Sequence, residues 1–142
     1  MTNRTSPLNN HLFHGMTLIE LIIVVAIVAI LLTLAVPNYR SYTLRVHRSE
    51  AIRMLMQASI CQERIHANHG SYDTGQCQAV SEQQRYQLSY TSPNTQGQSY
   101  VVVATPKGGQ LADICGSLSL DQNGAKGISA VNISVMKCWN GR

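Results

Sequence analysis

The sequence lacks the side-chain arrangements on which enzymes and metal sites usually depend. Among its 142 residues we find no nucleophile–base pair, no paired carboxylates and no phosphate-binding loop. The four cysteines include no CxxC pair, and their successive gaps of 16, 38 and 23 residues do not supply the closely spaced ligands of a zinc site. His66 and His69 lie near a predicted helix end, and we do not expect them to bind a metal. We therefore expect no enzymatic activity, no cofactor and no bound metal.

Acidic residues and the largest aromatic residues are also few. The chain has seven Asp and Glu residues and eleven Lys and Arg residues, which gives a net charge of +4. It has one Trp and one Phe. The modest positive charge permits contact with phosphate-bearing partners without requiring it. Trp139 and the six tyrosines are expected to pack in the core and hairpins. No low-complexity tract or internal repeat is present, and the length allows one domain.

The chain does have an even number of cysteines. Once residues 1–36 are set aside, 106 residues remain, which is enough for a small core that benefits from extra cross-links. Four cysteines without metal-ligand spacing predict two disulfides formed in an oxidising compartment. The cysteines therefore predict that the C-terminal part lies outside the cytoplasm.

A long apolar run begins abruptly after Gly15 and continues to Val36. Its main part, Leu21–Val36, consists of Ala, Val, Ile and Leu with one Thr. A helix over residues 16–36 would be about 32 Å long, which matches the hydrocarbon core of a bilayer. One carboxylate, Glu20, lies near its front. A charge inside hydrocarbon costs roughly 2.5 kcal/mol or more, and such residues usually mark function.

The run has two ordinary interpretations, a cleaved secretory signal and a plain membrane anchor. It exceeds the roughly 7–15 apolar residues of a signal, and the LAVPN that follows is a poor cleavage site. A plain anchor explains the length but not the carboxylate. Charge counting favours a cytoplasmic C-terminal side, because Arg40, Arg45 and Arg48 follow the run and only Arg4 precedes it. The cysteines indicate the opposite orientation, and we follow them because a small domain needs their bracing.

The segment HGMTLIELIIVVAIVAILLTLAVPNYRSY resembles the start of a type IV pilin or related pseudopilin, over residues 14–42 without a gap. The resemblance implies that prepilin peptidase cuts between Gly15 and Met16, and that Met16 becomes the N-methylated first residue, where the family more often has Phe. It also places Glu20 at the family's invariant carboxylate and Pro37 at its helix-kinking proline. The expected divisions are a leader peptide (1–15), a transmembrane and assembly helix (16–36) and a globular pilin domain (37–142) that includes the second half of the helix.

Glu20 then has a physical role in filament assembly. Inside a filament the helices pack away from water and lipid, where an unpaired charge is strongly disfavoured. The free amine of Met16 in a neighbouring subunit is the available cation, so pairing with it would select one axial stagger between helices. The alternative is a glutamate at a helix start, favoured only by the helix dipole.

A second, amphipathic helical part is predicted after Pro37, which is expected to bend or melt the helix locally. Apolar residues recur at three- and four-residue spacing over Tyr39–Asn68, and Gly70 is a plausible stop. The charged residues of this part are expected to form a solvated face with scattered ion pairs, or to contact lipid headgroups and acidic neighbours: Arg40, Arg45, Arg48, Arg53, Arg64, Glu50 and Glu63.

Strand signals follow the helix. Alternation and β-branched residues predict strands at Arg85–Thr91, Ser99–Thr105 and Ser117–Asp121, and DQNGAKG predicts a hairpin turn. A short last strand is expected at Gly127–Ser129 or Val131–Met136. The expected α+β fold is a long N-terminal helix, half transmembrane and half amphipathic, packed on a three- or four-stranded antiparallel sheet. The pilin resemblance implies the same arrangement.

The four cysteines allow three pairings. We favour Cys61–Cys77, which ties the helix end to the loop GSYDTGQC, and Cys115–Cys138, which closes the last hairpin. Each would contribute roughly 3 kcal/mol in a chain-entropy estimate. The second pair resembles the C-terminal disulfide-bounded loop of type IV pilins. The stretch DICGSLSLDQNGAKG, with KCW near the end, resembles the PilE-type minor pilins.

Three functions remain open from the sequence. The first is a structural, minor subunit of a type IV pilus that supports pilus biogenesis, twitching motility, adhesion or DNA uptake. The second is a pilus-borne DNA receptor, with Lys107, Lys126, Lys137 and Arg142 as candidate contacts in a basic tip whose binding would weaken with salt. The third is a type II secretion pseudopilin, a class that generally lacks the C-terminal disulfide loop.

These functions share most of their expected partners: other pilin subunits, prepilin peptidase and the inner membrane before assembly. The DNA receptor adds extracellular DNA. We expect a single-pass protein in the inner membrane with its C-terminal domain periplasmic, and afterwards an extracellular pilus.

Overall fold

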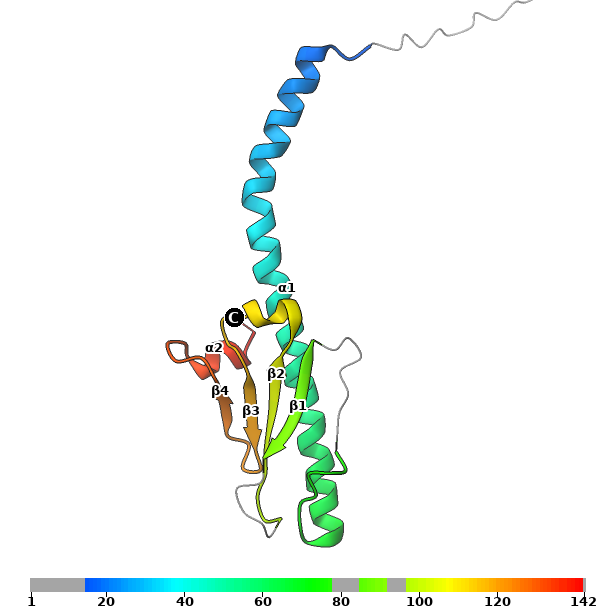
Figure 1. Ribbon diagram of the computed structural model, residues 1–142, viewed down its shortest axis with the longest axis vertical. Coiled ribbons are helices and arrows are strands. Elements are labelled where there is room, and N and C mark those ends of the chain that lie inside the picture. The colour runs from blue at the N-terminus through cyan, green and yellow to red at the C-terminus, as the bar shows by residue number, and fades with distance from the viewer. Residues whose placement is uncertain (1–14, 78–84, 92–96, 142) are drawn as a thin grey trace, which may run out of the picture. The chain divides into compact units, whose positions relative to one another are not determined.

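The computed structural model describes residues 15–77, 85–91 and 97–141, so most of the expected leader lies outside the described residues. The chain divides into two compact units, Met1–Pro37 and Asn38–Arg142, and the second is called the head below. In chain order the elements are α1 (Leu18–His69), β1 (Tyr86–Thr91), β2 (Val101–Pro106), the 3₁₀-helix η1 (Gly108–Ala112), β3 (Leu118–Asp121), β4 (Lys126–Ile128) and α2 (Val135–Trp139) (Figure 1).

Helix α1 runs without a break for 52 residues, and Pro37 lies inside it. The expected melting at Pro37 is therefore wrong, because a proline removes only its own N–H donor while the hydrogen bonds of the flanking turns persist. The helix ends at His69, as expected. Gly70 follows with φ +71°, and its N–H donates to the His66 carbonyl at 2.7 Å, which closes the last turn.

The head contains a four-stranded antiparallel sheet with strand order β1-β2-β3-β4. Its register aligns Tyr90 with Val102, Val102 with Leu120, and Leu120 with Lys126. The expected strands and the hairpin turn are confirmed. In that turn the Asp121 carboxylate accepts hydrogen bonds from the N–H groups of Asn123 and Ala125, at 2.9 and 2.7 Å.

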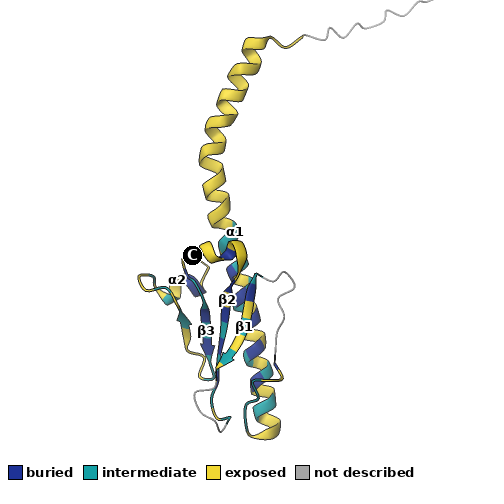
Figure 2. Ribbon diagram, in the orientation of Figure 1, coloured by how far each residue is buried: buried dark blue, intermediate teal, exposed yellow. Residues whose placement is uncertain are grey.

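The second half of α1 packs against this sheet. Its small and aliphatic residues Ala51, Leu55 and Ala58 are at most 2% exposed and share one apolar cluster with the sheet. The rest of the buried cluster is Tyr86, Tyr100, Val102, Ala104, Leu118, Leu120 and Trp139. Figure 2 shows the buried residues concentrated in the second half of α1 and in the strands. The side chains thus alternate in and out along the strands, as a one-faced sheet requires.

Two alternative positions were expected for the last strand, and the structure agrees with one of them. β4 spans Lys126–Ile128, in agreement with the first expectation, but the expected strand at Val131–Met136 is wrong. That region leads into α2, whose Trp139 indole N–H donates to the Gly127 carbonyl at 3.1 Å. Burial of Trp139 against the sheet outweighs the weak strand preference of its flanking residues, because large aromatic side chains contribute most per residue to packing.

Two disulfides join the elements of the head. One links Cys61 of α1 to Cys77, and the other links Cys115, just before β3, to Cys138 of α2. These are the two pairings that the sequence favours. They tie the C-terminal end of α1 and the last helix to the loops beside them.

Candidate functional site

The N-terminal part of α1 is apolar and open on all sides. Every described residue up to Tyr42 is exposed, and the large apolar side chains up to Val36 are between 46% and 77% exposed. By length and composition the helix can cross a membrane, with a mean hydropathy of 3.1 in its most apolar window and none of that window buried. Such a surface is unstable in water, so it requires lipid or other helices around it.

The first turn of α1 holds the residues of the expected processing and assembly site. Thr17 precedes the helix, and its hydroxyl accepts a hydrogen bond from the Glu20 N–H at 3.3 Å. This is half of a capping box, a Thr followed three residues later by Glu, which stabilises a helix start. The Glu20 side chain is exposed, as is Met16. The cap at this helix start is thus the Thr17 side chain, which binds the backbone of Glu20 and leaves the Glu20 carboxylate available for another role.

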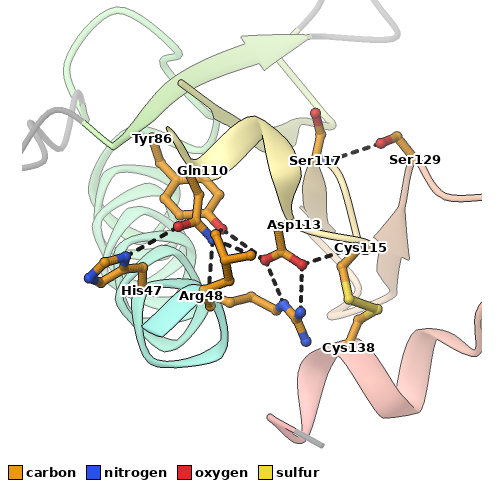
Figure 3. A network of polar contacts seen from close by, with 10 residues as sticks. His47, Arg48, Tyr86, Gln110, Asp113, Cys115, Ser117, Ser129 and Cys138 are labelled. Carbon is orange, nitrogen blue, oxygen red and sulfur yellow. Dashed lines mark hydrogen bonds and ion pairs between the residues drawn. A yellow bond between two sulfur atoms is a disulfide. The ribbon is translucent and has the colours of Figure 1, made fainter. Parts of the chain in front are cut away.

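The head contains a buried ionic network near the beginning of its part of α1 (Figure 3). Asp113 accepts hydrogen bonds from Arg48 Nε at 2.9 Å and Arg48 Nη2 at 2.5 Å. The Asp113 and Arg48 side chains are 0% and 2% exposed. Asp113 also accepts the Cys115 backbone N–H at 3.0 Å. The expectation that Arg48 belongs to a solvated face is wrong, because η1 and the loop after it cover this turn of the helix.

Gln110 of η1 connects this network to the helix and the sheet. Its Nε2 lies 3.0 Å from the Leu44 carbonyl, 2.8 Å from the Tyr86 hydroxyl and 3.1 Å from an Asp113 oxygen. Its Oε1 lies 3.3 Å from His47 Nδ1. Hydrogen bonds among side chains from α1, β1 and η1 thus hold these three elements together.

Burial raises the pKa of the Tyr86 hydroxyl far above its usual value, and the charge of Asp113 adds to the rise. The hydrogen bond from Gln110 and the charge of Arg48 act in the opposite direction but are smaller effects. Tyr86 is therefore neutral over the whole physiological range. Its hydroxyl serves as a hydrogen-bonding link and has no acid–base role.

One atom of the network has no partner among the described residues. Arg48 Nη1 is buried and makes no hydrogen bond. A buried charged donor without a partner is costly, and such atoms are few in folded proteins. No signal in the sequence distinguishes Arg48 from the other arginines of the helix, since its burial depends on a loop 65 residues away.

The candidate DNA contacts do not gather at one place. Lys107 follows β2, beside Arg85, whose carbonyl accepts its N–H at 2.7 Å. Lys126 begins β4 and aligns through Leu120 with Val102, near the other end of β2. The two lysines lie at opposite ends of the sheet, so the expected single basic tip is wrong.

The other two candidate DNA contacts are Lys137 and Arg142. Lys137 is exposed on α2. Arg142 lies outside the described residues. Lys126 Nζ lies 5.1 Å from the centre of the Trp139 ring, which fixes its position over α2. Lys126 and Lys137 therefore belong to adjoining elements, while the Lys107 backbone lies beside that of another cation, Arg85.

A long exposed apolar helix that continues into a disulfide-braced helix-on-sheet head defines the class of type IV pilins. Two family models match the chain: the prokaryotic N-terminal methylation motif over residues 11–36, and "Type IV minor pilin ComP, DNA uptake sequence receptor" over residues 37–119. The second model covers more than half of the chain. The chain therefore belongs to the ComP family of type IV minor pilins.

Individual pilins are similar over parts of the chain. A fimbrial protein of Neisseria meningitidis is 41% identical over 70 residues, which are 49% of this chain and 41% of that protein. A type IV major pilin PilE1 of Neisseria gonorrhoeae is 44% identical over 63 residues, 44% of this chain and 38% of its own length. The chain thus spans about two fifths of the length of these relatives.

Two solved structures share the fold. A type IV pilin from Shewanella oneidensis has a TM-score of 0.52 and 30% identity, covering 64% of this chain and 98% of the other. The non-core minor pilin PilV of Neisseria meningitidis has a TM-score of 0.50 and 22% identity, covering 67% and 95%. The second likeness shows the fold alone.

Proposed function

We propose that the chain is a minor subunit of a type IV pilus that enters the filament through its N-terminal helix. The observation that carries the proposal is the fully exposed apolar helix with a single carboxylate, Glu20, in its first turn. The match to the N-terminal methylation motif supports cleavage by prepilin peptidase between Gly15 and Met16, followed by methylation of Met16. The two disulfides of the head support a periplasmic orientation before assembly.

Mass spectrometry of purified surface filaments tests this proposal. The expected result is a chain that begins at a methylated Met16, contains both disulfides, and is present at low abundance beside another pilin. A chain found only in the periplasm would favour a secretion pseudopilin. A chain that retains residues 1–15 in filaments would contradict the proposed processing.

A second function, binding of extracellular DNA by the head, is favoured by the family match, since that family is described as a DNA uptake sequence receptor. The described cations do not form one tip: the Lys107 backbone lies beside Arg85, Lys126 lies over the Trp139 ring, and Lys137 is exposed on α2. Arg85 also lies 3.6 Å from a Glu50 oxygen, so part of its charge is compensated. The pair on β4 and α2 is the stronger candidate for phosphate contact.

A mobility-shift assay with duplex DNA tests the second function. Removal of one lysine–phosphate contact is expected to lower the slope of binding against salt by about one. Lys126→Gln combined with Lys137→Gln should weaken retention more than Arg53→Gln combined with Arg64→Gln, which removes equal charge from exposed positions on α1. No retention of the unaltered chain at low salt would exclude DNA binding, while the filament role would stand.

A further inference from the structure

A cavity of about 170 Å³ lies beside the buried network of the head. Its lining combines three cations, Arg45, Arg48 and Lys137, with apolar residues; the remaining lining residues are Ser41, Leu44, Ala112, Asp113 and Ile114. The volume is similar to that of a cavity of about 150 Å³ that takes up a benzene-sized molecule. It therefore admits a small polar group with a few attached carbons.

The electrostatics of the cavity favour an anion. Its one carboxylate, Asp113, is already engaged by two nitrogens of Arg48. The third nitrogen, Arg48 Nη1, is buried and without a partner among the described residues. Figure 3 shows the guanidinium between Asp113 and the helix α2 that carries Lys137. A tetrahedral oxyanion in the cavity would lie between the other two cations, and a small shift of the Arg48 side chain would bring the closed-off Nη1 onto it as the missing acceptor.

The apolar side chains around the cavity favour a lipid over other molecules that contain a phosphate group. Ile114, which lines the cavity, is 61% exposed. Leu111 and Met136, which directly precede the lining residues Ala112 and Lys137 in the chain, are 69% and 66% exposed. Basic side chains beside exposed large apolar ones are typical of surfaces that lie on a membrane. A site for the DNA backbone or for free phosphate has no use for such apolar side chains.

The position of the cavity in the chain agrees with a membrane ligand. Ser41 follows the end of the apolar run, Val36, by five residues. Tyr39 and Tyr42 between and beside them are 69% and 59% exposed, and exposed tyrosines are enriched at the membrane–water interface. The headgroup layer begins where the hydrocarbon ends. Along the helix the cavity begins at Ser41, about 8 Å beyond Val36, and extends to Arg48, about 18 Å beyond it, so its Ser41 end is the part nearest the headgroups.

We propose that this cavity binds the phosphate of an anionic phospholipid while the subunit is held in the membrane. Arg48 Nη1, Arg45 and Lys137 bind the phosphate, and Leu111, Ile114 and Met136 contact the carbons beneath it. The proposal rests on the membrane-held stage of the proposed function. Lipid release would then have to accompany entry of the subunit into a filament.

The test uses the full chain in nanodiscs that contain phosphatidylcholine with a fraction of phosphatidylglycerol carrying a photoreactive headgroup. Cross-linked peptides are identified by mass spectrometry. We expect adducts on the segments around Ser41–Arg48 and Lys137. Arg45→Gln combined with Lys137→Gln should lower these adducts about tenfold or more. The matched control, Arg53→Gln combined with Arg64→Gln, should leave them unchanged, and Trp139 fluorescence verifies that both variants fold.

Several outcomes would overturn the proposal. An equal loss of adducts in both double variants would show that the lipid responds only to total charge. Displacement of the lipid by inorganic phosphate would assign the cavity to a soluble oxyanion, and displacement by duplex DNA would assign it to DNA. Mutual cross-links between heads instead of lipid adducts would assign it to a second copy. Failure of the chain to insert into nanodiscs would contradict the membrane-held stage itself, which is a separate result.

Discussion

Arg48 of α1 and Asp113, 65 residues later, form an ion pair in which both side chains are almost completely buried, with Arg48 Nη2 2.5 Å from Asp113 Oδ1. A second hydrogen bond, from Arg48 Nε, strengthens the pair, and Gln110 connects it to the sheet. The pair joins the part of the head nearest the apolar run to the loop before β3. It determines how that loop covers the helix.

Removal of one member of this pair is expected to destabilise the head strongly. Asp113→Leu leaves the Arg48 charge buried without compensation, which should lower the free energy of unfolding by about 3–5 kcal/mol. The double variant with Arg48→Met should recover part of this loss, since no unpaired charge remains. Denaturant unfolding in detergent, followed by the fluorescence of the single tryptophan, Trp139 of the head, measures both. A double variant less stable than Asp113→Leu would contradict this account.

Alkaline pH is expected to destabilise the head through Tyr86. Its pKa is raised in the folded state, so above the usual pKa of about 10 the unfolded chain loses a proton that the folded chain keeps. The stability is complete below pH 10 and falls by about 1.4 kcal/mol per pH unit above it from this group. Tyr86→Phe should remove that part of the slope.

Two further tyrosines of the head should add smaller slopes to this alkaline loss. Burial also raises the pKa of Tyr90 and Tyr100. The onset is measured by tyrosinate absorbance together with Trp139 fluorescence. A pH profile that is flat above 10 in the unaltered chain would exclude the explanation.

Gly116 and Gly124 provide a matched pair of substitutions in the disulfide-bounded region. Both have positive φ, +62° and +78°. A Cβ at Gly116 would lie 2.2 Å from Ser129 Oγ, which accepts the Ser117 N–H, whereas a Cβ at Gly124 meets nothing within 4 Å. Gly124→Ala should cost about 1–2 kcal/mol from backbone strain alone.

Gly116→Ala should cost more, because the displaced Ser129 also loses its hydrogen bond to Ser117. Unfolding midpoints of the two variants, compared with the unaltered chain, give the difference. Equal costs would show that Ser129 moves aside freely.

Glu20→Ala is expected to separate processing from assembly. Cleavage before Met16 should continue, while incorporation into filaments falls, because the buried amine of the neighbouring subunit has no counter-charge. Glu20→Gln is the useful comparison, since it keeps the size of the side chain and removes only the charge. Immunoblots of sheared filaments measure incorporation. Unaltered incorporation of both variants would show that assembly does not need the Glu20 charge.

A bulky residue at Gly15 is expected to block cleavage. The residue before the cut lies in the protease groove, where the absence of a side chain helps. Gly15→Phe should therefore accumulate as a heavier, membrane-held precursor on a gel. Gln57→Phe, at an exposed position of α1 in the head, provides a control that should be processed normally.

The sequence by itself determined the membrane-length helix, the class of the fold and the strands of the sheet. The apolar run from Leu21 to Val36, the alternation at Arg85–Thr91 and the turn at DQNGAKG are local patterns, and local patterns report on the secondary structure in which they occur. They required no knowledge of distant residues.

Tertiary structure alone decided which charged residues are buried and where the cations gather. Arg48 has the same sequence neighbourhood as Arg45, yet η1 covers one and leaves the other exposed. Lys107 and Lys126 are separated by the strand register, and the helix α2 forms because Trp139 packs on the sheet. These outcomes depend on contacts between segments far apart in the chain, and the energy of such contacts is absent from any local pattern.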